Sequence, residues 1–168
     1  MRIHTASLIG AAILATVGCS GDTNTSAPRT PLLSLLATAA PEEDIQWGPA
    51  PPIFPKGAEF AVLQGDPSKS EEFTVRLRFP NGYKIPPHWH SNAEQLTIIS
   101  GNFVLHMGDS MKAEPHALDA GGYHFLPAKM HHAAEIKGET VVQITGTGPF
   151  DIHYLNPADN PNPKSAQK

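Results

Sequence analysis

The chain has 168 residues, enough for one domain with appendages, and its aliphatic and aromatic content suffices for one buried core. A formal net charge of −4 argues against nucleic acid as a partner, because binding it requires a basic face. Seventeen prolines and fourteen glycines separate short apolar runs, a pattern that predicts many strands joined by turns rather than helices.

Residues 1–18 are typical of a signal peptide. Arg2 supplies a positive start, and the apolar stretch from Ala6 to Val17 is too short to span a bilayer comfortably. Cys19, the sole cysteine, follows a small residue, as at the cleavage and lipidation site of bacterial lipoproteins. Thr16 stands where such sites usually have leucine, so the alternative is an ordinary secretory signal. In both cases we expect export to the periplasm, with a lipid anchor through Cys19 in the first.

Residues 19–44 predict a flexible, disordered tether. Polar and turn-forming residues dominate its first half, which cannot bury enough surface to fold alone. The leucines at 32–36 are expected to be weakly ordered. We expect one folded domain over residues 45–157 and a disordered tail over 158–168.

Strand signals recur from Ile45 onward. The proline-rich stretch 49–55 predicts an extended arm. A strand is expected at 58–64, and residues 71–79 alternate cleanly between apolar and polar side chains, which predicts a half-buried strand. Further strands are expected at 94–99 and 102–107, joined at Ser100-Gly101, then at 122–126, at 131–136 and 140–145, joined as a hairpin at Gly138-Glu139, and at 151–155. The irregular stretch 108–119 is expected to hold one helical turn.

Two histidines and a glutamate lie between Gly82 and Gly101. In a strand, residues two apart share a face, so His88 and His90 project together, and a three-residue turn brings Glu94 to a similar depth. Two imidazoles and a carboxylate that converge on one point are typical of half of a divalent-metal site. The alternative is a pair of solvated surface histidines beside a turn.

A pair of adjacent histidines follows at 131–132. His132 shares a strand face with Ala134, whereas His131 shares its face with Glu135 and Lys137, whose burial without partners is costly. We therefore expect His132 to point into the core and His131 to point outward.

The two histidine stretches together resemble the two motifs of the cupin family. The first matches at every fixed position: glycine, five residues, histidine, one, histidine, three, glutamate, six, glycine. The second fits at Gly121, Pro127 and His132, but Lys129 stands in place of its glycine, which bears on the turn after Pro127, and Ile136 in place of its asparagine. The resemblance implies an all-β fold, the double-stranded β-helix or jelly-roll barrel, with the metal ligands His88, His90, Glu94 and His132.

This ligand set implies one divalent metal ion. On a six-coordinate ion it leaves two positions open for water, dioxygen or an oxygen-donor substrate. Because it has no thiolate, it suits iron, manganese, nickel, copper or zinc. Cupins include dioxygenases, decarboxylases, isomerases and binding domains. We therefore hold two hypotheses: a metal-dependent, oxygenase-type oxidoreductase acting on a small organic molecule, or a non-enzymatic metal-bound ligand-binding or sensor domain at the membrane. The resemblance also allows a homodimer, to which the proline-rich arm would cross.

No residue beyond the four ligands is assigned a catalytic role. His106 is expected to be solvated, because it lies on the strand face opposite Phe103 and Leu105. The orientation of His124 stays open, and with it a role as a hydrogen-bonding partner of the metal ligands, because its neighbours compete for the core.

Overall fold

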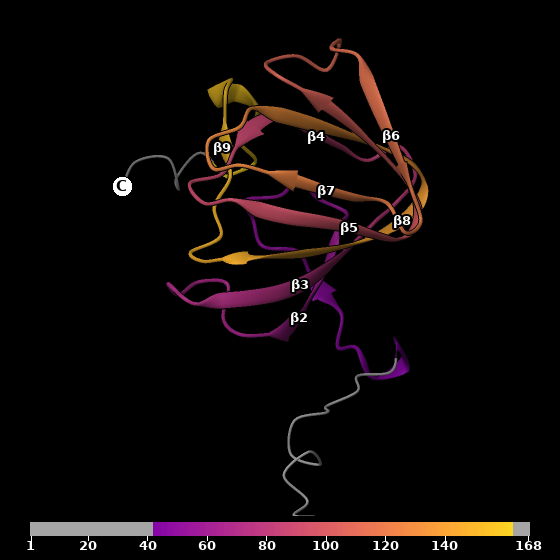
Figure 1. Cartoon of the computed structure of the whole chain (residues 1–168), viewed down its shortest axis with the longest axis vertical. Coiled ribbons are helices and arrows are strands. Elements are labelled where there is room, and N and C mark those ends of the chain that lie inside the picture. The colour runs from indigo at the N-terminus through magenta and orange to yellow at the C-terminus, as the bar shows by residue number, and fades with distance from the viewer. Residues whose placement is uncertain (1–41, 163–168) are drawn as a thin grey trace, which may run out of the picture. The chain divides into compact units, whose positions relative to one another are not determined.

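A computed structural model of the chain describes residues 42–162 (Figure 1). The signal peptide predicted at 1–18, Cys19, most of the predicted tether and the end of the predicted tail lie outside the described residues. The described residues fall within the unit Ala39–Lys168. No helix among them is long and apolar enough to cross a membrane.

Nine strands and two short 3₁₀ helices make up the described chain. The strands are β1 (Gly48–Pro49), β2 (Glu59–Gln64), β3 (Glu72–Phe79), β4 (Lys84–Trp89), β5 (Glu94–Met107), β6 (Pro115–Asp119), β7 (Tyr123–Leu126), β8 (His132–Thr147) and β9 (His153–Tyr154). The helices are η1 (Glu42–Asp44), at the end of the predicted tether, and η2 (Pro157–Asp159), at the start of the predicted tail.

All nine strands belong to one hydrogen-bonded sheet, and its two longest strands, β5 and β8, bend so that it folds into the two sheets of a barrel. These two strands pair antiparallel along most of their length, with Glu94 opposite Gly146 and Met107 opposite His132. In one sheet, the first half of β5 lies between β7 and the second half of β8, and β3, β2 and β1 follow beyond β8. In the other sheet, the second half of β5 lies between β6 and the first half of β8, and β4 and β9 follow beyond β8. The two sheets therefore curl around one core, as Figure 1 shows, and the predicted jelly-roll fold is confirmed.

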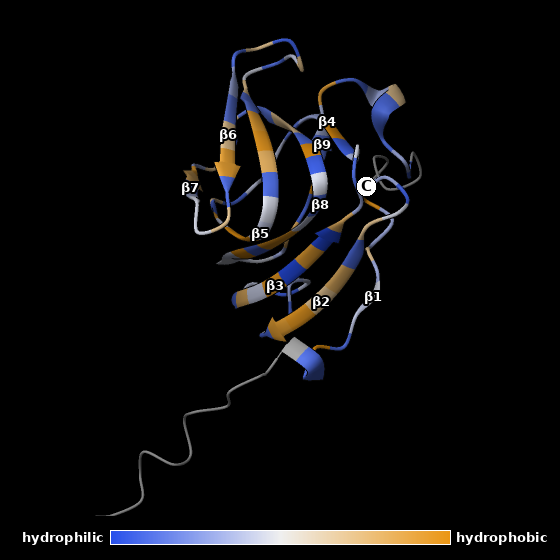
Figure 2. Ribbon diagram, turned by 90° about the vertical axis from the view of Figure 1, so that its right-hand side faces the viewer, coloured by the Kyte–Doolittle hydropathy of each residue, from blue (hydrophilic) through white to orange (hydrophobic). Residues whose placement is uncertain are grey.

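Strand β3 illustrates how the sequence builds this core. Hydrophilic and hydrophobic residues alternate along it (Figure 2). Its four inward side chains are at most 2% exposed, and burying each contributes roughly 1.5–3 kcal/mol relative to exposure. These residues are Phe73, Val75, Leu77 and Phe79.

The breaks predicted at Ser100-Gly101 and Gly138-Glu139 were wrong, because both glycines lie within continuous strands. The backbone at Gly101 and Gly138 has positive φ, 84° and 78°, and the register shifts around Ser100. A Cβ at Gly101 would collide with the Glu139 carbonyl oxygen, so only glycine fits there. The bulge and the glycines bend the strands from one sheet into the other without ending them.

The proline-rich stretch 49–55 begins at the end of β1, with Pro49, and then folds into a turn rather than the extended arm that was expected. The Phe54 N–H donates to the Pro51 carbonyl at 2.9 Å, and the Phe54 ring is buried in the core. The Tyr83 hydroxyl donates to the Pro55 carbonyl. The stretch packs against its own barrel because its apolar ring and its carbonyl groups find partners there.

The stretch 108–119 and the histidine before it also differ from expectation. A turn, closed by a 3.0 Å hydrogen bond from Ala113 N–H to the Ser110 carbonyl, and then β6 replace the predicted helical turn. His106 is buried at 5% exposure rather than solvated, and its Nδ1 lies 2.9 Å from the Ala113 carbonyl oxygen. The turn folds back over the outer face of β5. It therefore covers His106, which the alternation of side chains along the strand would place in solvent.

Candidate metal centre

The predicted ligands come from the ends of three strands that meet at one end of the barrel. His88 lies near the end of β4 and His90 directly follows it, whereas Glu94 begins β5 and His132 begins β8. Strand pairing places His88 opposite His132. All four side chains are buried, at 3–6% exposure. The alternative of solvated surface histidines is therefore wrong for His88 and His90.

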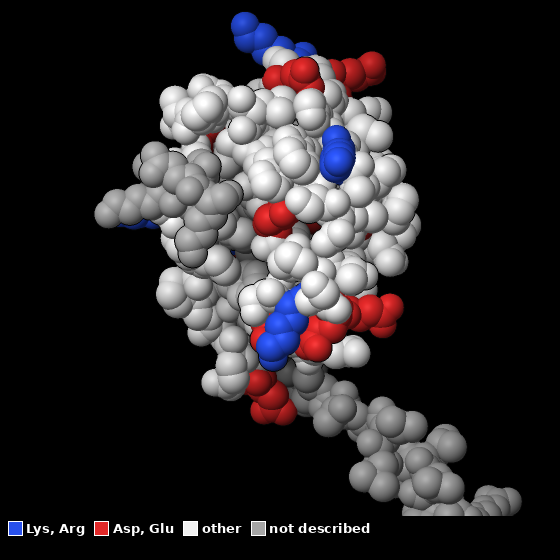
Figure 3. Space-filling model, turned by 90° about the vertical axis from the view of Figure 1, so that its left-hand side faces the viewer, with Lys and Arg blue, Asp and Glu red and all other residues white. Residues whose placement is uncertain are grey.

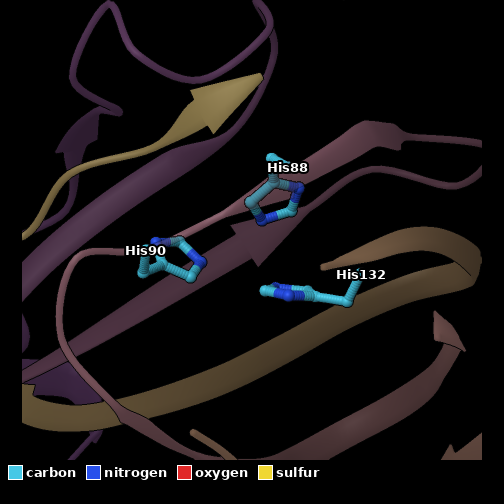
Figure 4. Close-up of side chains that lie close together, drawn as sticks. All are labelled: His88, His90 and His132. Atoms are coloured by element: carbon cyan, nitrogen blue, oxygen red, sulfur yellow. The ribbon is translucent and has the colours of Figure 1, made fainter. Parts of the chain in front are cut away.

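The donor atoms of these side chains converge on one point. Figure 4 shows the three imidazoles turned toward one another, and their facing nitrogens lie within 4.8 Å of one another. Glu94 Oε1 lies 3.5 Å from His90 Nε2 and 3.6 Å from His132 Nε2. Donors bound to one ion at about 2.0–2.2 Å are at most about 4.4 Å apart, so only small side-chain shifts separate this arrangement from a coordination shell.

The backbone fixes the tautomer of each imidazole. The Nδ1 atoms of His88 and His132 lie 2.7 Å and 2.9 Å from the carbonyl oxygens of Pro86 and Met130, each two residues earlier in the chain. The Nδ1 atom of His90 contacts the Asp151 carbonyl oxygen. Because a carbonyl only accepts hydrogen bonds, each Nδ1 carries a proton, and in the neutral form of each ring Nε2 then has the free lone pair. This is the arrangement that metal-ligating histidines have in proteins.

The electrostatics of the cluster fit a divalent cation. Burial, followed by the proximity of His132 and His90, lowers the pKa of His88 well below its usual value. Burial also lowers the pKa of His132, against the opposing effect of Glu94. Among the described residues Glu94 Oε2 has no hydrogen-bond partner, although it is buried. A cation bound by Glu94 Oε1 and by the imidazole lone pairs would offset the cost of burying this carboxylate, so the residues present fit the metal that the fold implies.

The segment after β8 forms one wall of the cluster, and sequence reasoning missed it. Besides the contact of its carbonyl with His90, Asp151 accepts a 2.8 Å hydrogen bond from the Ser91 N–H through Oδ1. The Phe150 ring stacks on the His90 imidazole at 5.2 Å between centroids and 16° between planes. No spacing rule within the sequence connects these residues with His90, about 60 positions earlier.

The second motif keeps its turn despite its departures from the family pattern. Lys129 adopts the left-handed conformation, with φ of 63°, that the motif's glycine would adopt. Its N–H donates to the His90 carbonyl at 2.8 Å, and the Met130 N–H donates to the Pro127 carbonyl at 3.1 Å. The turn that leads into β8 is therefore tied to the residue directly after β4.

The other described histidines lie outside the cluster. His131 points outward, as expected, and its Nδ1 lies 2.6 Å from Asp109 Oδ1. His124 pairs with Leu96 and shares its strand face with the buried Leu126, and its proximity is a minor cause of the lowered pKa of His132. It therefore lies near the cluster without belonging to it.

A hollow of about 380 Å³, partly open to solvent, continues from the cluster into the barrel. We call it the chamber. Its polar wall consists of the four predicted ligands, and its remaining lining is apolar. None of the described lining residues is Lys or Arg. Residues of the apolar wall include Phe54, Leu77, Phe79, Leu96, Leu126 and Ile144.

Two sheets that share β5 and β8 around a histidine cluster define a cupin barrel. Residues 37–151 match the family described as "ChrR Cupin-like domain", and the chain belongs to this family of cupins. Cupins commonly bind a metal, and the three imidazoles are arranged to do so here. A comparison with curated proteins gives no match.

Several solved structures have the same fold. The polyketide cyclase RemF from Streptomyces resistomycificus has a TM-score of 0.58 at 13% identity, over 79% of this chain and 94% of that chain. A putative acetylacetone dioxygenase from Methylibium petroleiphilum has a TM-score of 0.55 at 20% identity, over 71% and 81%. An RmlC-like cupin from Shewanella frigidimarina has a TM-score of 0.52 at 17% identity, over 66% and 90%. At these identities the likeness establishes the fold alone.

Proposed function

We propose that the protein is a metal-dependent enzyme, an oxygenase-type oxidoreductase acting on a small organic molecule with oxygen donor atoms. The observation that carries the proposal is the convergence of three preoriented imidazoles on a buried carboxylate with one unpaired oxygen. His88, His90, Glu94 and His132 would hold one divalent ion. When bound, that ion supplies Lewis-acid or redox chemistry at the polar end of the chamber.

The chamber walls support a role in binding and orienting the substrate. Their apolar side chains exclude water and favour an apolar molecular body, so the oxygen donors of the substrate would be oriented toward the ligand cluster. The described lining residues include no charged residue besides Glu94, so none of them offers a cationic side chain to bind an anionic tail. A small, largely apolar molecule with one oxygen-rich end fits these walls best.

The absence of a separate acid or base among the described lining residues favours oxygenase chemistry over reactions that need proton transfer by the protein. The Tyr154 ring lies 5.9 Å from the His88 ring, and the Tyr154 hydroxyl group donates a hydrogen bond to the Ile53 carbonyl oxygen. One of the structural neighbours is described as a putative acetylacetone dioxygenase, which supports the choice of β-diketones among the first compounds to test.

Metal analysis followed by oxygen-uptake assays would test the proposal. We expect the protein purified without added metal to contain close to one equivalent of a transition metal. After anaerobic reconstitution with iron, manganese, nickel, copper or zinc in turn, at least one form should consume oxygen with diketones, catechols or flavonols. His131→Gln is the matched control, because it changes a histidine adjacent to a ligand without touching the cluster. Absence of turnover with every metal would contradict the enzymatic proposal.

The same lack of an acid or base favours a second candidate, a non-enzymatic ligand-binding or sensor domain. A compound that binds tightly and is recovered unchanged would support this candidate, whereas product formation would exclude it. The face in Figure 3 has scattered charges and, among the described residues there, no continuous basic patch, which agrees with a small molecule rather than nucleic acid as the partner.

We also propose that the domain is exported to the periplasm and lipid-anchored through Cys19, on the basis of the N-terminal sequence alone. Mass spectrometry of the membrane fraction should find an acylated N-terminal peptide that Cys19→Ala abolishes. A homodimer stays a prediction from the cupin resemblance, and sedimentation analysis would test it.

A further inference from the structure

A second hollow lies on the other side of the ligand cluster. It is a depression of about 190 Å³, open to solvent, between the loop after β4 and the segment after β8, and we call it the outer cleft. His90, Glu94 and Phe150 line both the chamber and the outer cleft, so these three side chains form the partition between them. The remaining lining of the outer cleft is mixed in polarity: Phe73, Asn92, Ala93, Thr147, Pro149 and Asp151.

Phe150 is the member of this partition that is not a predicted metal ligand. Its ring contacts an aromatic side chain on each side, Phe54 of the chamber at 6.1 Å and Phe73 of the outer cleft at 5.5 Å between centroids. It also stacks on the His90 imidazole. Removing this ring would join the two hollows while leaving all four donor side chains in the chain.

The backbone around Phe150 is held in place. The Phe150 N–H donates to the Pro67 carbonyl at 2.7 Å, and the Gly148 N–H donates to the Glu71 carbonyl at 2.9 Å. On the other side, Asp151 is tied to Ser91 and His90. The ring is thus a fixed wall, and the space available beside the cluster depends on the size of the side chain at position 150.

We propose that Phe150 sets the maximum length of the ligand that the centre accepts. This inference rests on the proposed metal centre. A ligand whose oxygen donors face the cluster, and whose body lies along the Phe150 side of the chamber, is blocked at the partition by the Phe150 ring. With a smaller residue at 150, a longer ligand also occupies the outer cleft, where Phe73 and Pro149 offer apolar contact and Asn92 and Thr147 offer hydrogen bonds.

A chain-length series of metal-chelating probes tests the proposal. The full chain is loaded with Co²⁺ and titrated with straight-chain hydroxamates, from acetohydroxamate upward, and binding is followed by the visible absorption of Co²⁺. While a chain finds apolar space, affinity should rise by up to about fourfold per added methylene. In the wild type this rise should stop at a short chain, and in Phe150→Ala it should continue for several more carbons.

Two further variants make the test decisive. Phe60→Ala removes a partly buried ring from β2 that lines neither hollow, so its cut-off length should equal that of the wild type. Phe150→Leu keeps an apolar contact with the core and should move the cut-off by a smaller amount; it decides the question if circular dichroism finds Phe150→Ala unfolded.

The outcomes separate this inference from the proposed function. An equal cut-off length in the wild type and in a folded position-150 variant, both with Co²⁺ bound, would overturn the role of Phe150 alone. If the wild type shows no Co²⁺ spectrum at all, the metal centre is wrong and the inference falls with it.

Discussion

His132 and His106 lie one register step apart on the β5–β8 ladder, on opposite faces, and they differ in a way that defines the site. Both are buried, and both have Nδ1 at 2.9 Å from a backbone carbonyl oxygen. The Nε2 of His132 faces Glu94 and two other imidazoles, whereas the buried Nε2 of His106 has no hydrogen-bond partner among the described residues. Burial and a hydrogen bond from Nδ1 to the backbone are thus common to both, and the convergence of donor atoms distinguishes a candidate centre from a single buried histidine.

The largest effect on metal binding is expected from truncating one of the predicted ligands inside the barrel. His132→Ala and His90→Ala should each weaken metal binding by more than about 100-fold, since even partners of metal ligands typically contribute 10–100-fold. The strands should stay folded, because the apolar core supplies most of the stability. Elemental analysis and titration with Co²⁺ measure the first effect, and circular dichroism measures the second. Full metal content in either variant would refute the assignment of ligands.

Truncating His106, on the outer face of β5, should lower the free energy of unfolding and leave the metal content unchanged. His106→Ala removes a buried side chain together with its hydrogen bond to Ala113, and should cost about 1–3 kcal/mol of unfolding free energy. Urea denaturation measures this cost, and one bound metal per chain should be retained. Loss of metal from this variant would erase the difference between the two histidines.

The turn that leads into His132 offers a stabilising change. Lys129→Gly removes the left-handed strain of a residue with a Cβ, partly offset by the greater freedom of glycine in the unfolded chain, and should stabilise the domain by about 0.5–1 kcal/mol. Thermal and urea unfolding measure the gain. Metal affinity should not change, because the N–H to the His90 carbonyl is kept. A destabilised variant would mean that the lysine side chain itself contributes to the turn.

The smallest effect is expected beside the centre. His131→Gln removes the contact of the His131 ring with the Asp109 carboxylate at the surface, and surface contacts of this kind contribute at most about 1 kcal/mol. Unfolding free energy should change by less than that amount, and Co²⁺ affinity should equal that of the wild type. A large loss of metal would mean that the alternation of faces at the start of β8 was assigned wrongly.

Local spacing was enough to predict β3 and the candidate ligands. The side chains of β3 alternate without interruption, and the His-x-His spacing with Glu94 fixes three donors near one strand end. The costly burial of Glu135 decided between His131 and His132. These predictions needed only residues that lie a few positions apart in the chain.

The features that were missed depend on distant parts of the chain. The continuity of β8 is an exception, because a local signal for it exists. A glycine such as Gly138 can mark either a turn or a bend. The buried residues on its two sides, Ile136 and Val142, are an even number of positions apart, as in one continuous strand. By contrast, the cover over His106 and the contact of Asp151 with His90 follow from tertiary packing. Periodicity within one strand carries no information about them.

The carbonyl of Asp151 orients an imidazole that precedes it by 61 positions. During synthesis, His90 emerges long before the residue that sets its tautomer. The proposed pocket for the ion is therefore complete only after the C-terminal segment has docked, so a metal held by all four side chains would bind after the barrel has assembled.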